Sequence, residues 1–439
     1  MRRSIHLLAA TALAATLVAA CGSSGKKAAS PSTSTTSAKI NLAGTTLAVD
    51  AEWSGDEQAN FQKVVSKFEQ DTGAKIVYTS TGDDVAAVIG TAVAGGKPPD
   101  VALLPQPGLL KDLATKGSLT ALDDIVGKEV DANYAPIWRQ LATVNGKLYG
   151  VAFKAANKST VWYSTKVFKQ AGVEPPKTFD DLVKTAKTIS DSGVTPISQG
   201  GADGWTLTDW FENIYLRTAG ADMYDKLTQH QIPWTDPSVK TALTMMGQIL
   251  APQLLVGGSN GALQTDFPKS VDQVFTDPPK GGIVYEGDFV ASNIKKETQA
   301  KLGVDADFFP FPAINGSKSA VTGGGDIAVL MKDSPGGQAL IKYLATPEAA
   351  QIWASQGGFT SPNKKVDPSV YPDDVTRRSA EELTGASVFR FDMSDQTPAA
   401  FGGTVGQGEW KVLQDWLANP TAIDQTAQRL EDAAKTAYK

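Results

Sequence analysis

The hydrophobic positions of the chain first fall into a regular order near residue 46. Residues 46–49 form a short apolar run of the kind that builds a buried strand. The next apolar positions share the i, i+3, i+4, i+7 spacing of one helix face: Phe61, Val64, Val65 and Phe68. Ser54 and Glu57 have the spacing of a capping box, and Gly73 stands where such a helix would stop. The pattern therefore predicts a strand and then a helix that begins after Ser54.

The same alternation continues to about residue 104. Residues 75–78 and 101–104 have the composition of strands, and residues 84–94 between them have that of a helix closed by Gly95 and Gly96. Strands that alternate with helices are typical of a parallel sheet covered on both faces. We therefore expect the folded chain to start with an α/β lobe.

The middle and the end of the chain are richer in helical spacing. Residues 147–153 and 161–163 have the pattern of β-segments that lead out of this lobe. The clearest helix begins at Thr178 as its N-cap, and residues 205–219 predict a helix in their later half. A strand with proline edges at 307–312 predicts a return to the first lobe. Further helices are expected at 334–356, as two short ones, and from residue 360 to the end of the sequence.

The first twenty residues have the features of an export signal. Arg2 and Arg3 precede an apolar run, at residues 5–18, that is too short to cross a bilayer permanently. The run ends in Val-Ala-Ala-Cys at residues 18–21, which resembles the lipobox of bacterial lipoproteins. We therefore expect cleavage before Cys21 and a diacylglycerol on its thiol, while a leftover cysteine after an ordinary signal peptide is the alternative. The sequence leaves open whether export uses the general or the twin-arginine route.

Composition limits the remaining choices of function. The net charge of −6 becomes −8 once Arg2 and Arg3 leave with the signal peptide, and an acidic body argues against nucleic acid as a partner. His6 and His230 are the two histidines, so a histidine metal site or a Ser-His-Asp triad would depend on His230 alone. The remaining ~400 residues exceed what one hydrophobic core usually serves, which predicts two lobes.

Seven segments resemble the extracellular sugar-binding proteins of bacterial ABC importers, in the broad group that includes maltose-type receptors. In chain order they are GKPPDV at 96–101, GSLTALDD at 117–124, NGKLYGV at 145–151, WYS with a later Phe at 162–168, PPKTFDDL at 175–182, GGGD at 323–326 and YLATPE at 343–348. Their order and spacing extend over nearly the whole mature chain. Finer features are similar to the alpha-glucoside binders: TDW at 208–210, IPWTDP at 232–237 and SPNK at 361–364.

The resemblance implies an α/β, two-lobed periplasmic-binding-protein-like fold with hinge crossings and a central ligand cleft. The crossings are expected near 152–158, 306–314 and 356–361. The expected parts of the chain are a lipoprotein signal peptide at 1–20, a lipid-anchored flexible tether at 21–43, an N-terminal lobe from 44–153 plus 310–357, and a C-terminal lobe from 154–309 plus 358–439.

A sugar presents hydroxyl groups at fixed angles and one apolar C–H face. Hydrogen bonds to charged groups contribute roughly 1.5–3 kcal/mol each, and aromatic rings stack on the apolar face. The candidate ligand-binding residues are Trp53, Glu57, Asp84, Gln106, Lys154, Trp205, Asp209, Trp210, Glu286, Gly324 and Asp326. Each has an ordinary structural alternative: core packing for the tryptophans, helix capping for Glu57 and Asp84, an exposed lysine, or a hinge turn for the glycine.

These features together predict the substrate-binding subunit of a carbohydrate ABC importer, which binds an alpha-glucoside or oligosaccharide. The expected partners are that sugar, a permease with a cytoplasmic ATPase, and the membrane through the lipid anchor only. The receptor is expected to be a monomer on the outer face of the cell membrane, with neither cofactor nor metal and no enzymatic activity. A secreted glycoside hydrolase remains the alternative, because two carboxylates in a cleft would suffice for it.

Overall fold

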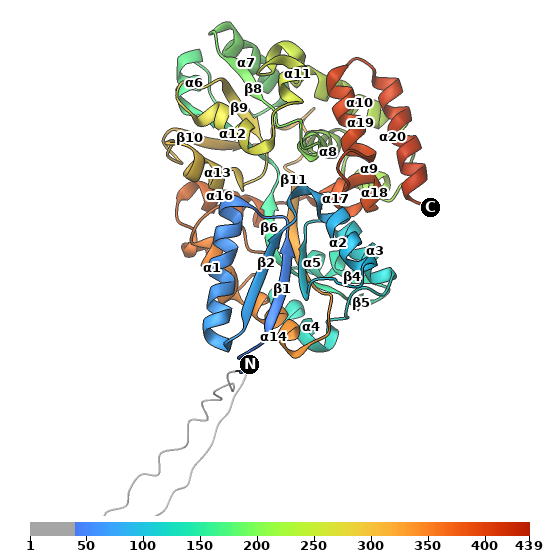
Figure 1. The fold of residues 1–439 in the computed structure, drawn as a ribbon. Coiled ribbons are helices and arrows are strands. Elements are labelled where there is room, and N and C mark those ends of the chain that lie inside the picture. Colours follow the sequence, from blue (N-terminus) through green and yellow to red (C-terminus); the bar gives the residue numbers. More distant parts are fainter. Residues whose placement is uncertain (1–39) are drawn as a thin grey trace, which may run out of the picture. The chain divides into compact units, whose positions relative to one another are not determined.

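The computed structural model describes residues 40–439, which form one compact unit (Figure 1). The predicted signal peptide, the predicted lipidation at Cys21 and all of the tether before residue 40 lie outside the described residues. Two lobes make up the unit, each built on its own sheet.

The first sheet is mixed, with its earliest strands in parallel. β1 pairs in parallel with β2 and with β3, as predicted, and β3 then pairs antiparallel with β11. β11 also pairs with β6 and, at its start, with β12. The strands are β1 (Thr46–Ala51), β2 (Lys75–Ser80), β3 (Val101–Leu104), β6 (Gly150–Asn157), β11 (Val321–Leu330) and β12 (Phe389–Phe391).

The helices of this lobe begin and end close to the predicted positions. The N–H of Gly73, in the left-handed region, donates to the Glu69 carbonyl and ends α1, which buries Phe61, Val64, Val65 and Phe68 as predicted. The capping box is wrong, because the Ser54 side chain makes no capping hydrogen bond. The elements are α1 (Gly55–Thr72), η1 (Gly82–Asp84), α2 (Val85–Ala94), α3 (Pro107–Thr115), α4 (Asp123–Asn133), α5 (Pro136–Leu141), the hairpin β4 (Thr143–Val144) and β5 (Lys147–Leu148), α14 (Pro335–Leu344), α15 (Pro347–Ala354), η3 (Pro368–Val370) and α16 (Asp374–Gly385).

The second lobe has a smaller sheet and more helices. Its strand order is β10-β7-β9-β8, in which β8 and β9 are parallel. The Thr178 hydroxyl caps α7 by accepting from the Asp181 N–H, as predicted, whereas α8 is helical throughout rather than only in its later half. The elements are β7 (Thr160–Ser164), α6 (Thr165–Ala171), α7 (Phe179–Asp191), β8 (Thr195–Ser198), α8 (Trp205–Ala219), α9 (Ala221–Thr228), α10 (Pro237–Ile249), η2 (Pro252–Leu254), α11 (Gly258–Ala262), α12 (Phe267–Phe275), β9 (Gly281–Tyr285), α13 (Val290–Glu297), β10 (Ala306–Pro310), α17 (Met393–Gln396), α18 (Ala399–Gly402), α19 (Gly408–Ala418) and α20 (Ile423–Ala437).

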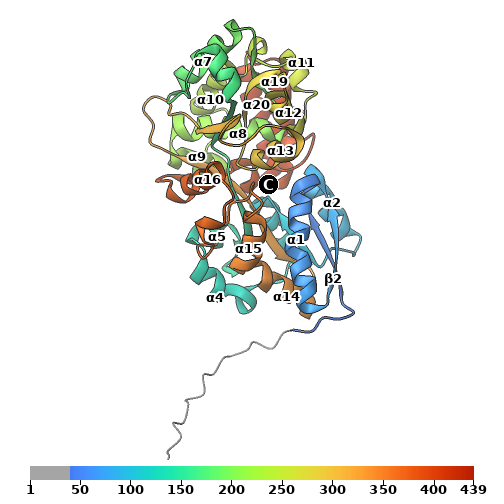
Figure 2. The ribbon, with the colours of Figure 1, turned by 90° about the vertical axis from the view of Figure 1, so that its left-hand side faces the viewer.

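Separate hydrophobic cores hold the two lobes. The first core surrounds β1, β3 and β11, and the second surrounds α8, α10 and the C-terminal helices. The chain passes between the sheets from β6 to β7 and from β10 to β11. Figure 2 shows the lobes one above the other, with α16 at the waist between them.

The structure differs from the expectation at the third crossing, which was placed at 356–361. Phe359, Leu383 and Phe391 belong to the core of the first lobe, and β12 extends the first sheet. After β12 the chain enters the core of the second lobe, and Met393 is the first residue after β12 that is buried in that core. The segment 359–391, assigned from the sequence to the second lobe, thus packs mainly with the first.

The glycine run at 323–325 is part of a strand rather than a hinge turn. It lies in β11 opposite β6, where a Cβ on Gly325 would come within 2.3 Å of the Lys154 carbonyl oxygen. A Cβ on Gly323 would meet the Phe389 ring at 2.5 Å. These glycines therefore allow neighbouring chain segments to approach β11 closely.

Neither a membrane span nor a metal site is found in the described part of the chain. No helix between residues 40 and 439 combines the length and apolarity needed to cross a bilayer. Within the same residues, no group of three or more His, Cys, Asp or Glu is arranged to hold a metal ion.

Candidate functional site

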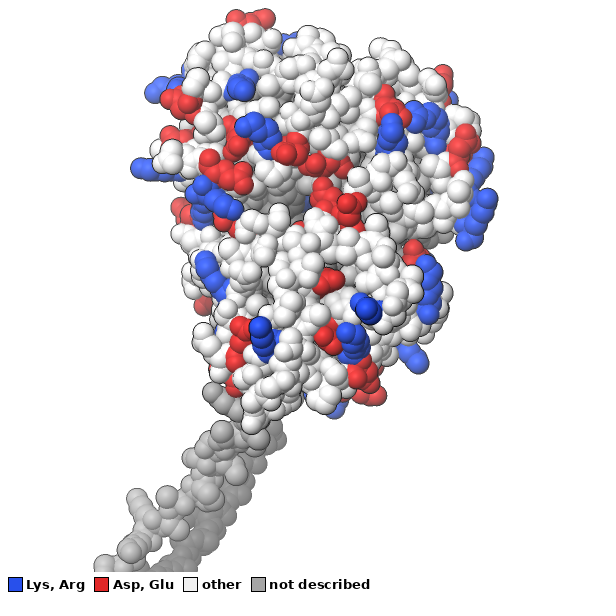
Figure 3. Space-filling view, viewed as in Figure 1, with Lys and Arg blue, Asp and Glu red and all other residues white. Residues whose placement is uncertain are grey.

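A cavity of about 380 Å³ lies between the lobes. Its walls come from the turns after β1, β2 and β3, from β6 and β11, and from α8, α12, α13 and the C-terminal helices. The carboxyl ends of the parallel strands meet at this edge of the first sheet, which is where ligands bind in open α/β sheets. Figure 3 shows acidic side chains gathered at the boundary between the lobes.

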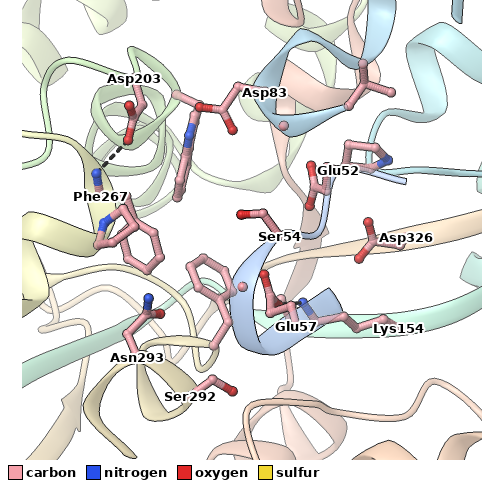
Figure 4. Close-up of a pocket in the computed structure, with 18 of the residues that line it drawn as sticks. Glu52, Ser54, Glu57, Asp83, Lys154, Asp203, Phe267, Ser292, Asn293 and Asp326 are labelled. Atoms are coloured by element: carbon pink, nitrogen blue, oxygen red, sulfur yellow. Dashed lines mark hydrogen bonds and ion pairs between the residues drawn. The ribbon is translucent and has the colours of Figure 1, made fainter. Parts of the chain in front are cut away.

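The wall from the first lobe is rich in hydrogen-bond acceptors. The turn after β1 supplies Glu52 and Ser54, the first turn of α1 supplies Glu57, and η1 supplies Asp83. In Figure 4 the side chains of Glu52, Ser54 and Glu57 point into the space between the lobes. Gln106, the residue before α3, adds an amide that is only 4% exposed.

The wall from the second lobe combines aromatic rings with further acids. The ring centroids of Trp205 and Phe267 are 5.4 Å apart, and those of Phe267 and Phe289 are 5.3 Å apart. Asp203 lies beside them and accepts a hydrogen bond of 2.6 Å from the Phe267 N–H. The cavity therefore places acidic groups opposite a continuous aromatic surface, as Figure 4 shows.

Lys154, on β6, is buried in the floor of the cavity. Its Nζ lies 2.5 Å from Glu57 Oε1 and 5.3 Å from the ring centroid of Trp353. Burial lowers the pKa of the Lys154 ammonium, but the carboxylates of Glu57 and Asp326 outweigh this effect and raise it above its ordinary value. The lysine is therefore charged over the whole physiological range.

Lys158 follows β6 and neutralises a second set of acids. Its Nζ lies 2.5 Å from Asp392 Oδ2, 3.2 Å from Asp209 Oδ1 and 3.7 Å from Asp395 Oδ2. Burial alone would raise the pKa of Asp392, but Lys158 and neighbouring hydrogen bonds hold it below its usual range. Burial raises the pKa of Asp209 to about 7. The four side chains thus form a buried network that reaches the cavity through Lys158 and Asp395.

Several buried polar atoms of the cavity wall have no partner among residues 40–439. They are Gln106 Oε1, Asp326 Oδ1 and the Trp410 indole Nε1. Each residue is at most 4% exposed. Because an unpaired buried polar group costs about 1–3 kcal/mol, these atoms are suited to receive the polar groups of a ligand.

The structure brings five of the eleven candidate residues to the described cavity wall: Glu57, Gln106, Lys154, Trp205 and Asp326. Asp209 and Glu286 lie behind the wall, fully buried, and Asp209 contacts Lys158. Gly324 lies within β11, where a Cβ would meet the Lys158 side chain.

The other candidates lie in places that explain them structurally. Trp53 is 1% exposed and packs against Phe61 and Trp353, with ring centroids 5.0 and 4.7 Å apart. Trp210 is fully buried and donates its indole N–H to Gln199. Asp84 precedes α2 at its N-cap position, while its neighbour Asp83 lines the cavity.

Sequence reasoning missed part of the wall. Lys158, Asp203, Phe267, Phe289, Asn293 and Trp410 line the cavity and were not among the candidates. Glu52 could have been found from the period of the strand. Every second residue faces the core, namely Leu47, Val49, Ala51 and Trp53, so Glu52 must point to the other side. Trp410 lies on α19, far along the chain, and its sequence context gives no sign of a site.

Comparisons with known proteins agree with this architecture. The family model for bacterial extracellular solute-binding proteins matches residues 52–351. The alpha-glucosides-binding periplasmic protein AglE of Rhizobium meliloti (strain 1021) is 37% identical in an alignment of 414 positions that covers 90% of this chain and 89% of that protein. The osmoprotective compounds-binding protein GgtB of Synechocystis sp. is 35% identical in an alignment of 385 positions that covers 85% of this chain and 90% of that protein.

Solved structures share the fold at lower sequence identity. The bacterial solute receptor AcbH, described as exclusively preferring β-D-galactopyranose, superposes with a TM-score of 0.78 and 21% identity, covering 90% of this chain and 100% of that chain. Maltose-bound MalE3 of T. maritima superposes with a TM-score of 0.71 and 18% identity, covering 89% and 99%. These likenesses establish the two-lobed receptor fold.

Proposed function

The chain belongs to the bacterial extracellular solute-binding proteins, and from this premise we propose that it is the receptor of a carbohydrate ABC importer, which captures an alpha-glucoside or a short oligosaccharide and delivers it to a permease. The single observation that carries the proposal is the cavity between the lobes, in which acidic acceptors face an aromatic surface. AglE, which is 37% identical and covers 90% of this chain, is named for alpha-glucosides, and this supports that sugar class.

The roles of the side chains follow from the chemistry of a sugar. The apolar face of a ring would stack on Trp205, Phe267 or Phe289, which offer large area at low entropic cost. Its hydroxyl groups would donate to Glu57, Asp326 and Gln106 Oε1, and one would accept from the Trp410 indole. Because these groups come from both lobes, a bound sugar would favour the closed arrangement of the receptor.

A calorimetric screen tests the proposal. The chain from residue 22 onward, without the predicted signal peptide and the anchoring cysteine, is titrated with glucose, maltose, trehalose, sucrose and maltotriose. We expect at least one glucoside to bind and, at a hundredfold excess over its Kd, to stabilise the folded state by about 2.7 kcal/mol. This stabilisation appears as a rise in the melting temperature of several degrees.

The same samples separate a receptor from a hydrolase. We expect no reducing sugar to be released from trehalose or sucrose during prolonged incubation. Release of glucose by the purified protein would replace the proposal with glycoside hydrolysis. If none of the sugars binds, the receptor is not specific for glucosides.

Anchoring is a second part of the proposal and concerns residues outside the described ones. We propose that Cys21 carries a lipid, so that the receptor is held on the outer face of the cell membrane next to its permease. Replacing this residue, Cys21→Ser, is expected to move the protein from the membrane fraction to the soluble extracytoplasmic fraction. A variant that stays in the membrane fraction would contradict lipid anchoring.

A further inference from the structure

The cavity is lined by more acidic than basic side chains. Within residues 40–439 its wall includes two lysines, Lys154 and Lys158, and nine carboxyl groups: Glu52, Asp56, Glu57, Asp83, Asp203, Asp266, Glu297, Asp326 and Asp395. Both lysines are already engaged, Lys154 with Glu57 and Lys158 with the aspartates behind the wall. Asp56, Glu57 and Asp395 lie in ion pairs, whereas the other six acids make none within residues 40–439.

Glu52 is the clearest of these acids. It follows β1, is half-buried, and its carboxylate makes no hydrogen bond or ion pair within the described residues. Its charged neighbours are Asp326, Glu57 and Asp83, together with Lys154, which Glu57 already holds. Burial and these carboxylates raise the pKa of Glu52 well above its ordinary value. Figure 4 shows the carboxylate directed into the space opposite the aromatic wall.

Asp326 adds an independent observation at the same place. Its residue is 3% exposed, it lines the cavity, and Oδ1 has no hydrogen-bond partner among residues 40–439. Phe267, which Figure 4 labels, lies on the opposite wall and packs against Trp205 and Phe289. Carboxylates on one side and aromatic faces on the other are the surroundings that an organic ammonium group prefers.

We propose that Glu52 and Asp326 form a cation-selective subsite, so that a glycoside with an ammonium group binds more tightly than its neutral parent and an acidic glycoside binds least. The proposal rests on the glucoside-binding function above and adds the charge of the substrate to it. A neutral sugar leaves these carboxyl groups without a cation, whereas an ammonium group favours their ionised form and pairs with it. An anionic sugar meets carboxylates whose lysines are already occupied, so it finds no free counter-ion.

Matched ligands test this ranking. The probes are trehalose and its derivatives in which a primary hydroxyl is replaced by an ammonium or a carboxylate group, with maltose and its corresponding derivatives as a second set. Glucosamine and glucuronate form a third pair that does not depend on binding of a disaccharide. We expect the ammonium member of at least one set to bind about tenfold more tightly than the neutral member, as one charge-assisted hydrogen bond allows. We expect the carboxylate member to bind most weakly in every set.

A single isosteric variant identifies the residue responsible. Glu52→Gln keeps the size of the side chain and removes its charge, so the advantage of the ammonium probe over the neutral probe should fall about tenfold, while the carboxylate probe should bind more tightly. Glu297→Gln is the matched control, because it removes a carboxyl group from the other wall of the same cavity, and Glu52 and Asp326 are not among the charged neighbours of Glu297. It should leave the ranking unchanged.

Proton release gives a second readout. Because the pKa of Glu52 is raised, binding of an ammonium group should drive off its proton, whereas binding of the neutral parent should not. Calorimetry in buffers of different ionisation enthalpy measures this release, and Glu52→Gln should abolish it. Equal affinity for the three charge types, or a variant that weakens neutral and ammonium probes alike, overturns the proposal.

The two proposals fail in different ways. If neutral glucosides bind but charge has no effect, the receptor function stands and the cation-selective subsite is wrong. If no neutral sugar binds and glucosamine also fails to bind better than glucuronate, both are wrong. If glucosamine alone binds, the subsite stands and the glucoside specificity does not.

Discussion

At the scale of single residues, the side of an element on which a residue lies decides its role more than its chemical type does. Trp53 was a candidate because tryptophan suits sugars, but it continues the buried face of β1, and Glu52 takes the cavity side. On α8, Trp205 and Asp209 are four residues apart and share a face, whereas Trp210 turns into the core. Applying the strand and helix periods to the candidates would have separated them.

The two tryptophans of α8 should respond differently to truncation. Trp205→Ala should weaken sugar binding by about tenfold or more and leave the free energy of unfolding nearly unchanged, because the ring lines the cavity. Trp210→Ala should lower the free energy of unfolding by about 3–5 kcal/mol, because it leaves a hole beside Tyr285 and Phe311. Calorimetric titration and urea denaturation of both variants measure the difference. Strong loss of affinity in Trp210→Ala at unchanged stability would contradict this assignment.

Part of the site could not be predicted from residue patterns. Asp209 and Glu286 were expected near the ligand and lie directly behind the cavity, because a neighbouring lysine, Lys158, takes the exposed place. Phe267 and Trp410 come from distant helices, α12 and α19, and only tertiary packing brings them to one wall.

At the scale of elements, glycine matters where β6 and β11 lie against each other. Gly325→Ala should lower the free energy of unfolding by about 1–3 kcal/mol, because the new Cβ would lie 2.3 Å from the Lys154 carbonyl oxygen and push the strands apart. Gly90→Ala is the control: it lies inside α2 with nothing within 4 Å, and should stabilise by about 0.5–1 kcal/mol. Urea midpoints measure both. Equal shifts in the two variants would show that the close approach is not restrictive.

The helices and strands were well predicted from the sequence, but the assignment of residues 359–391 to a lobe was not. The α/β order to residue 104 and the helix that Thr178 caps were confirmed because local periodicity and capping specify them. Helix α16 buries Leu383 in the core of the first lobe and Val375 in a smaller cluster with Trp162 of the second lobe, so its pattern cannot tell which lobe it joins. This ambiguity explains the misplaced third crossing.

At the scale of the whole molecule, several ion pairs join the lobes, and one of them involves Asp56, which lines the cavity. Lys296 Nζ on α13 lies 3.1 Å from Asp56 Oδ1 on α1, and both side chains are partly exposed. Lys296→Ala should therefore weaken sugar binding about two- to fivefold, mainly through faster dissociation, as expected for an exposed pair of about 0.2–1 kcal/mol. Lys240→Ala breaks a pair with Asp424 within the second lobe and should not change binding. Stopped-flow measurements of the sugar dissociation rate compare Lys296→Ala with Lys240→Ala. Identical rates in these two variants would exclude a role for the pair between Lys296 and Asp56.

Stability of the ligand-free protein should rise as the pH falls from 8 to 5. Burial raises the pKa of Asp209 to about 7 and the pKa values of Asp326 and Asp288 to about 6, against about 3.9 in an unfolded chain. The folded state therefore holds more protons than the unfolded state in this window, so the free energy of unfolding falls as the pH rises. We expect a difference of about 1–3 kcal/mol between pH 5 and pH 8 in urea denaturation.

A substitution in the same group checks the origin of this pH dependence. Asp288→Asn removes one of the titrating carboxyls and should make stability less dependent on pH. Stability that increases toward pH 8 in the unmodified protein would contradict the assignment.

The cavity lysines occupy an unusual place in the chain. Lys154 lies on β6 and Lys158 directly after it, two residues before β7 begins in the other lobe. Contact with a guest molecule and rotation of the lobes therefore act on the same short stretch of polypeptide. A solvatochromic dye attached beside that stretch would report occupancy and lobe angle in one optical signal, so the receptor offers a ready location for a fluorescent biosensor.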